Sequence, residues 1–194
     1  MHVKRLPEEL AAKLDSIADD FLAQGADARM DAVATAIDVP RATLYYHFSG
    51  KDDLVTHFMR GKMQRVEHCI REALDGGGEP LDRFASALRA AAQELASNPA
   101  VCVNIMVAMG RMGAMEDLML ASDRQVLGPL REVLLEARAV DGLDLPDLDV
   151  TLSAIMGGIY MATVQQHART GAVDPDVIAD TVVAQALDGI RRGS

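Results

Sequence analysis

One short stretch of the sequence, RATLYYHFSGK, gathers side chains that can bind the bases and phosphates of a nucleic acid. Arg41 can place two parallel N–H groups on the O6 and N7 atoms of guanine. The hydroxyls of Thr43, Tyr45 and Tyr46 suit phosphate oxygens, and so does the ammonium group of Lys51. The stretch therefore predicts a surface that binds double-stranded DNA.

Two short helices are needed to position these side chains. Apolar spacing predicts helices over residues 30–37 and 41–46. Pro40 separates them, because proline fixes its own φ and fits the first positions of a helix. In a helix-turn-helix, the second helix enters the major groove while the first braces against the DNA backbone. Residues 29–47 have the lengths that this element needs.

The run from Thr43 to Phe48, followed by Lys51, resembles the recognition helix of TetR-type transcriptional repressors, and the similarity extends from residue 17 to about residue 58. The resemblance implies that Arg41, Ala42, Thr43 and Tyr45 face the groove. It implies that Tyr46, His47 and Lys51 contact phosphates. The candidate DNA-binding residues are Arg29, Arg41, Ala42, Thr43, Tyr45, Tyr46, His47 and Lys51.

Other interpretations exist for single members of this set. Tyr45 and Tyr46 alone would more often complete a small core, and His47 alone could be a capping or core histidine. Their combination at this spacing favours DNA binding. The sequence also departs from the family pattern: Asp38 replaces the turn glycine, although Asp tolerates a left-handed backbone, and Pro40 replaces a capping serine.

Charge makes nonspecific nucleic-acid binding a poor explanation. The net charge of the chain is −10, and residues 1–60 hold seven Lys or Arg against ten Asp or Glu. Because phosphate neutralisation needs cationic side chains, one DNA-binding domain alone should bind modestly. Specific binding should therefore depend on dimerisation and on the recognition helix.

The sequence predicts an all-α protein with a TetR-like architecture of nine helices. Its N-terminal helix-turn-helix domain covers residues 1–50. A ligand-binding and dimerisation domain covers residues 51–194, and a long helix over residues 51–74 connects the two. The expected helices cover residues 10–25, 30–37, 41–46, 51–74, 80–97, 99–110, 115–138, 147–169 and 175–191.

The last two helices are the expected dimer contact. Residues 147–169 are apolar on nearly every side, and residues 175–191 carry a wide apolar stripe. A core helix of a monomer is the alternative. A homodimer is favoured, because two half-sites one DNA turn apart need two recognition helices.

Methionines at helical spacing over residues 106–119 fit either adaptable core packing or a flexible apolar pocket. Few aromatic residues follow residue 74, so an aliphatic or acyl-type effector is expected rather than a planar cation. The candidate ligand-binding residues are Cys102, Asn104, Met106, Met109, Arg111, Met112, Met119, Tyr160, Val164 and His167.

Catalytic motifs and metal-ligand spacings are not found in the sequence, so we expect neither an enzyme nor a cofactor or metal. The two cysteines, Cys69 and Cys102, fit buried free thiols. No stretch reads as a membrane span or signal peptide, which predicts a cytoplasmic protein.

The predicted function is that of a ligand-responsive transcriptional regulator, in the first place a repressor. Its partners would be a palindromic operator, a small apolar effector and a second copy of the chain. The alternative is a helical adaptor or small-molecule carrier that does not bind DNA. The acidic balance of the N-terminal region makes this alternative conceivable.

Overall fold

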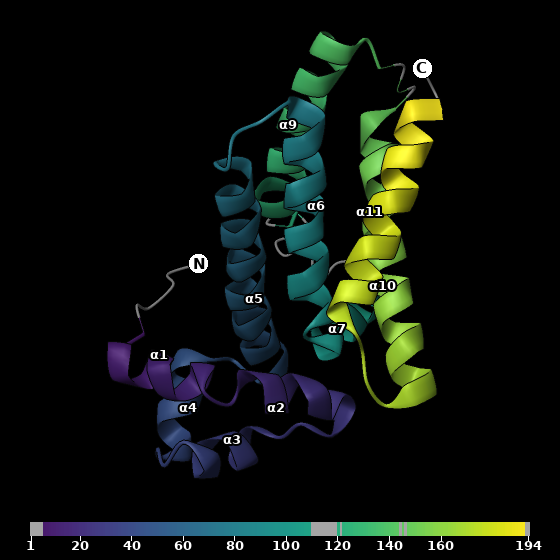
Figure 1. Cartoon of the computed structure of the whole chain (residues 1–194). Coiled ribbons are helices and arrows are strands. Elements are labelled where there is room, and N and C mark those ends of the chain that lie inside the picture. Colours follow the sequence, from purple (N-terminus) through teal and green to yellow (C-terminus); the bar gives the residue numbers. More distant parts are fainter. Residues whose placement is uncertain (1–5, 110–119, 121, 144, 146, 193–194) are drawn as a thin grey trace. The chain divides into compact units, whose positions relative to one another are not determined.

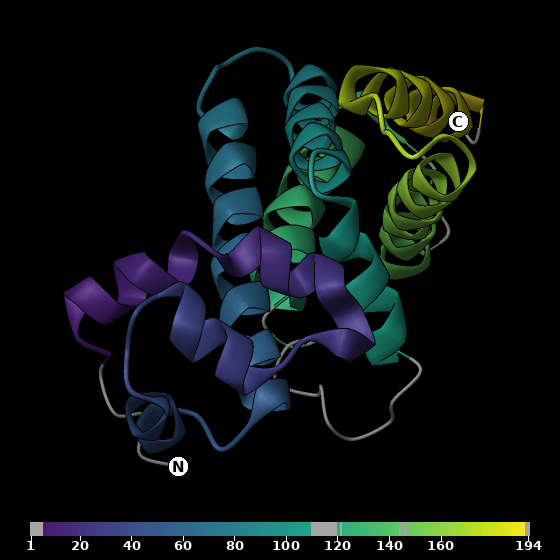
Figure 2. The ribbon, with the colours of Figure 1, turned by 90° about the horizontal axis from the view of Figure 1, so that it is seen from below.

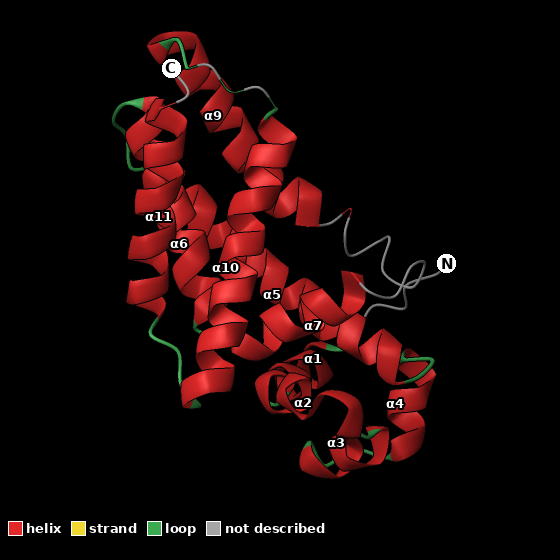
Figure 3. Cartoon of the chain, turned by 90° about the vertical axis from the view of Figure 1, so that its right-hand side faces the viewer, coloured by secondary structure: helices red, strands yellow, loops and turns green. Residues whose placement is uncertain are grey.

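The computed structural model describes residues 6–109, 120, 122–143, 145 and 147–192. Within these ranges the chain is helical and contains no strand, as Figure 3 shows. It divides into two compact units, Met1–Gly61 and Lys62–Ser194. We call the first unit the head.

The head contains four short α-helices, a 3-10 turn and the start of a long helix (Figures 1 and 2). These are α1 (Glu8–Asp15), α2 (Ala18–Gln24), η1 (Gly25–Asp27), α3 (Met30–Ala36), α4 (Arg41–His47) and the first part of α5 (Lys51–Leu74). The helices over residues 30–37 and 41–46 were thus predicted to within one residue at each end.

The single helix expected over residues 10–25 is wrong, because the structure has two helices there. The hydroxyl of Ser16 donates to the carbonyl of Lys13 at 2.7 Å. The amide of Ile17 bonds the carbonyl of Leu14, three residues earlier rather than four. A serine that bonds local backbone carbonyls competes with the helical pattern, and α1 ends at Asp15.

The second unit is a bundle built around α6. It contains the end of α5, α6 (Pro80–Ala96), α7 (Pro99–Met109), η2 (Asp123–Leu127), α9 (Gly128–Asp141), α10 (Leu148–Thr170) and α11 (Pro175–Arg192). Helix α6 packs against α9 and α11, and α10 packs against α7 (Figure 1). Its centre holds Phe84, Leu88, Leu130, Leu134 and Leu152, all fully buried. With ten α-helices in the described residues, the chain keeps the all-α architecture and exceeds the predicted count by one.

The helix expected over residues 115–138 differs from the structure where it is described. Residues 110–119 and 121 lie outside the described residues. Asp123–Leu127 is a π turn, in which the amide of Gly128 bonds the carbonyl of Asp123 five residues earlier. Pro129 has no amide to offer the carbonyl four residues before it, which favours this wider turn.

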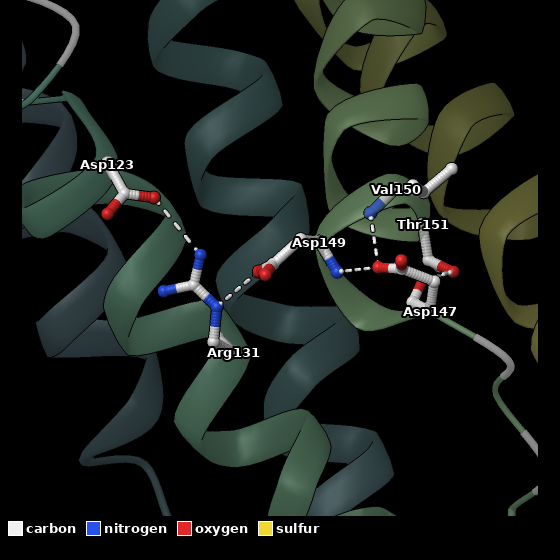
Figure 4. A network of polar contacts seen from close by, with 6 residues as sticks. All are labelled: Asp123, Arg131, Asp147, Asp149, Val150 and Thr151. Atoms are coloured by element: carbon white, nitrogen blue, oxygen red, sulfur yellow. Dashed lines mark hydrogen bonds and ion pairs between the residues drawn. The ribbon is translucent and has the colours of Figure 1, made fainter.

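A polar network holds the start of α10 against α9 (Figure 4). Arg131 donates through Nε to Asp149 at 2.7 Å and through Nη2 to Asp123 at 3.1 Å. Asp147 is the N-cap of α10, and its carboxylate accepts from the amides of Asp149 and Val150, both at 3.0 Å. The hydrogen bond with Asp123, followed by the one with Asp149, raises the pKa of Arg131.

Candidate nucleic-acid interface

The turn between α3 and α4 is fixed by the backbone of Asp38. Its φ is 51°, in the left-handed region that the sequence assigned to this position. The amide of Asp38 bonds the carbonyl of Thr35 at 3.3 Å, and the amide of Val39 bonds that of Ala34 at 3.0 Å. This pair of bonds is a Schellman motif, which ends α3 and redirects the chain into α4.

One face of α4 is anchored in the head. Leu44 is fully buried and Phe48 nearly so, as predicted for these two residues. Met30 and Val33 of α3 are buried as well, and the two helices pack against each other. The recognition helix therefore has a fixed orientation relative to α3.

The opposite face of α4 is open to solvent. Tyr46 is 62% exposed and Tyr45 45% exposed. Arg41 and Ala42 are exposed, and Thr43 is half-buried. An aromatic pair that completed a core would be buried, so the exposure of both tyrosines favours the DNA-binding interpretation over the structural one.

Arg41 does not extend freely into solvent. Its Nε lies 2.7 Å from Oδ1 of Asp31 in α3. Its Nη2 donates to the hydroxyl of Tyr45 at 3.5 Å, and its Cζ lies 5.4 Å from the Tyr45 ring centroid. The hydrogen bond with Tyr45, with a smaller contribution from Asp31, raises the pKa of Arg41. Sequence reasoning did not find Asp31, because the contact joins two different helices.

His47 is half-buried, and its Nδ1 atom is buried. Its ring lies perpendicular to that of Tyr46, with centroids 5.0 Å apart. A contact with phosphate would therefore have to use the Nε2 atom of His47.

Two further candidates lie at helix starts. Arg29 is exposed at the N-cap position of α3, and Lys51 is the first residue of α5. The turn before Lys51 is held by Asp53, whose carboxylate accepts from the amide of Ser49 at 3.0 Å and from its hydroxyl at 3.3 Å. Helix starts attract anions, so both positions suit a phosphate.

His57 of α5 is half-buried and borders the aromatic core of the head. Its ring centroid is 5.3 Å from that of Phe48 and 5.7 Å from that of Phe58. Burial lowers the pKa of His57, Arg60 acts in the same direction, and Asp15 and Asp53 oppose the shift. This histidine belongs to the support of the recognition helix.

In the second unit, α7 and α10 bring three polar side chains into the core. Cys102 is fully buried and donates to the carbonyl of Leu95 at 3.5 Å. Burial raises the pKa of Cys102 to about 12, and its neighbour Thr163 opposes the shift. Burial also raises the pKa of Tyr160 to about 12, and Cys102 adds to this effect. The sequence prediction missed Thr163, although it follows Tyr160 by three positions on the same face of α10.

The other candidate ligand residues differ in burial and in their contacts. Asn104 donates to the carbonyl of Ala100 at 2.8 Å, within its own helix. Met106 and Val164 are half-buried, and His167 is exposed. Met109 is the last residue of α7, and its side chain is not among those that the structure describes. Arg111, Met112 and Met119 lie outside the described residues.

The described residues show neither a metal site nor a membrane-spanning helix. They contain no cluster of three or more His, Cys, Asp or Glu side chains placed to hold a metal ion. Among them there is also no helix with the length and apolar character that a membrane span requires. Cys69 and Cys102 are both free thiols; Cys102 is buried as predicted, whereas Cys69 is only half-buried.

Known proteins match part of the head in sequence and nearly the whole chain in fold. Residues 14–58 match the family model of bacterial regulatory proteins of the tetR family. No protein of the curated set matches the chain.

Solved regulators share the fold at low identity. The fatty acid degradation regulator FadR of Bacillus halodurans is 18% identical, with a TM-score of 0.76 over 97% of this chain and 99% of that one. FadR of Bacillus subtilis, solved in complex with stearoyl-CoA, is 15% identical, with a TM-score of 0.76 over 93% and 99%. A Rhodococcus regulatory protein of the tetR family is 20% identical, with a TM-score of 0.72 over 95% and 98%.

A helix-turn-helix with an exposed second helix, followed by an all-helical unit, is the architecture that the chain shares with these regulators. Residues 14–58 resemble the DNA-binding domain of bacterial regulatory proteins of the tetR family, and the chain shares its fold with solved regulators of that type. The matched family model describes regulatory proteins, and the solved structures named above are regulators as well.

Proposed function

We propose that the protein is a repressor that binds a palindromic operator as a homodimer and is released by a small acyl-type effector. The exposed face of α4 carries this proposal. Arg41, Tyr45 and Tyr46 point outward from a helix whose opposite face is anchored by Leu44. Arg41 would read a base, and Tyr46 and Lys51 would contact phosphates.

The remaining interface residues have supporting roles in this proposal. Ala42, Thr43 and Tyr45 would line the groove beside Arg41. Arg29 and His47 would add backbone contacts. Because the net charge of the chain is −10, two recognition helices on one duplex would be needed for tight binding.

The proposed dimer contact is the open face of α10 together with α11. Helix α10 buries Leu152, Met156 and Ile159 within its own chain. Its opposite side is also apolar but exposed, and contains Val150, Ala154, Gly157, Gly158 and Met161. An exposed stripe of small and apolar residues on a long helix favours close packing against a second subunit.

The proposed effector is an apolar molecule of acyl type. The second unit has few aromatic side chains, which disfavours a planar aromatic ligand. The buried hydroxyls of Tyr160 and Thr163 could bond the carbonyl of an acyl group. The Bacillus subtilis relative solved with stearoyl-CoA supports this ligand class. Such a ligand releases DNA only if it binds the DNA-free conformation more tightly.

Mobility shifts of the full chain on DNA from upstream of its own coding sequence test the proposal. Wild type should bind at low salt, and Arg41→Ala should weaken binding by about tenfold or more. Arg71→Ala is the matched control, because it removes one exposed cationic side chain from the second unit. Stearoyl-CoA should release the DNA. Equal binding by Arg41→Ala and wild type would refute DNA recognition, and equal binding with and without stearoyl-CoA would refute the proposed effector.

A further inference from the structure

Asp31 and Arg41 form an ion pair that joins the two helices of the helix-turn-helix. Asp31 lies in the first turn of α3 and Arg41 is the first residue of α4. Oδ1 of Asp31 lies 2.7 Å from Nε of Arg41 in this ion pair, and this buried oxygen accepts no hydrogen bond in the structure. Both side chains remain accessible, with 48% and 61% of their surface exposed.

The contacts of Arg41 occupy one edge of its guanidinium group. Nε is ion-paired with Asp31, and Nη2 donates to the hydroxyl of Tyr45 at 3.5 Å. The end-on edge, formed by Nη1 and the second N–H of Nη2, can still place two parallel N–H groups on N7 and O6 of guanine. When a carboxylate pairs with one edge of the guanidinium group, the other edge presents its two N–H groups in a fixed orientation.

The ion pair lies at a shallow hollow of about 450 Å³ between α3 and α4. Its lining includes Asp31, Asp38 and Arg41. Two carboxylates here repel DNA phosphates, so they lower affinity for every sequence alike. By fixing Arg41, Asp31 offsets this loss of affinity only on DNA sequences that place a guanine where the guanidinium group can bond it.

Resting on the proposed DNA-binding function, we propose that Asp31 is the positioning residue that makes Arg41 selective for one base. Without Asp31, the guanidinium samples more rotamers and pairs with any nearby phosphate. Removal of Asp31 therefore weakens discrimination between DNA sequences while it strengthens binding to unrelated DNA.

Selection of duplexes from a randomised pool by the full chain tests this assignment. Wild type, Asp31→Asn and Asp38→Asn are compared. Asp38→Asn is the matched control, because it removes one negative charge from the same hollow and Asn tolerates the left-handed backbone at φ 51°. Affinities are then measured for the duplex enriched by wild type and for a scrambled duplex.

Asp31→Asn should lower the ratio of the two affinities by about tenfold and lose the preference at one base pair of each half-site. Asp38→Asn should keep the enriched sequence, although both variants bind scrambled DNA more tightly. Arg41→Lys, which cannot present two parallel N–H groups, should lose the same base preference. Adding Asp31→Asn to Arg41→Ala should have no further effect on the ratio.

An unchanged enriched sequence and ratio in Asp31→Asn would overturn the assignment while leaving DNA binding intact. Equal losses of discrimination in Asp31→Asn and Asp38→Asn would also overturn it, because charge alone would then explain the effect. If wild type enriched no sequence, the proposed DNA-binding function itself would fall. Since Asp31 is half exposed, Asp31→Asn should keep the melting curve of wild type.

Discussion

The ring of Phe21 packs edge to face against the ring of Phe58, with centroids 5.3 Å apart. The pair joins α2 to α5 in the core of the head, and both rings are almost completely buried. Phe48, at the end of α4, belongs to the same core through its contact with His57. Aromatic packing in the core of the head therefore orients α4.

Phe58→Ala should lower the free energy of unfolding of the head by about 3–5 kcal/mol, because it leaves a cavity beside Phe21. Chemical denaturation followed by circular dichroism measures this change. Val140→Ala serves as the control, since Val140 is 64% exposed and should change stability by less than about 0.5 kcal/mol. Similar losses in the two variants would contradict the proposed role of the aromatic core.

Head stability should fall as the pH drops below the ordinary histidine pKa of 6.5. The pKa of His57 is lowered in the folded protein, so the unfolded chain binds more protons over this range. Stability is therefore fully present above pH 6.5 and is lost as the pH falls through the lower folded pKa. His57→Gln should flatten this part of the stability profile. An identical profile in wild type and His57→Gln would exclude His57 as the cause.

Much of the head could be predicted from its sequence because the signals are local. Pro40 and Asp38 mark the turn, and the apolar positions Leu44 and Phe48 mark the buried face of α4. The break after α1 could not be read in this way. It depends on whether Ser16 points to solvent or bonds the backbone, which the residue type leaves open.

Contacts between helices were harder to predict. Asp31 and Arg41 meet only because the turn brings α3 and α4 to a particular angle. The burial of Thr163 beside Cys102 depends in the same way on how α10 packs against α7. Helical periodicity shows which residues share a face but not which face of a neighbouring helix they meet.

Asp147→Ala should destabilise the second unit by about 1 kcal/mol, because it removes the N-cap acceptor from the amides of Asp149 and Val150. Asp147→Ser should retain most of the stability, since serine can also accept these hydrogen bonds. Thermal unfolding at a fixed protein concentration separates the two variants. If Ser and Ala were equivalent at this position, the cap would not contribute as described.

Gly157→Arg should convert the proposed dimer into a monomer. A Cβ atom added at Gly157 meets nothing within 4 Å apart from its chain neighbours and the backbone of its own helix turn, so the substitution should not disturb the fold of the subunit. Gly61→Arg is the matched control, because Gly61 is also an exposed helical glycine with open space around it. Sedimentation velocity reports the mass of each variant. Wild type sedimenting as a monomer, or Gly157→Arg as a dimer, would refute this contact.

The most direct test of DNA recognition by α4 is a hydroxyl-radical footprint of the full chain on the duplex that it enriches from a randomised pool. We predict two symmetric protected regions centred about one helical turn apart, roughly 34–36 Å along the duplex. They should disappear in Arg41→Ala at a concentration that saturates wild type. A duplex cleaved evenly along its length in the presence of wild type, or a footprint unchanged by Arg41→Ala, would contradict the account.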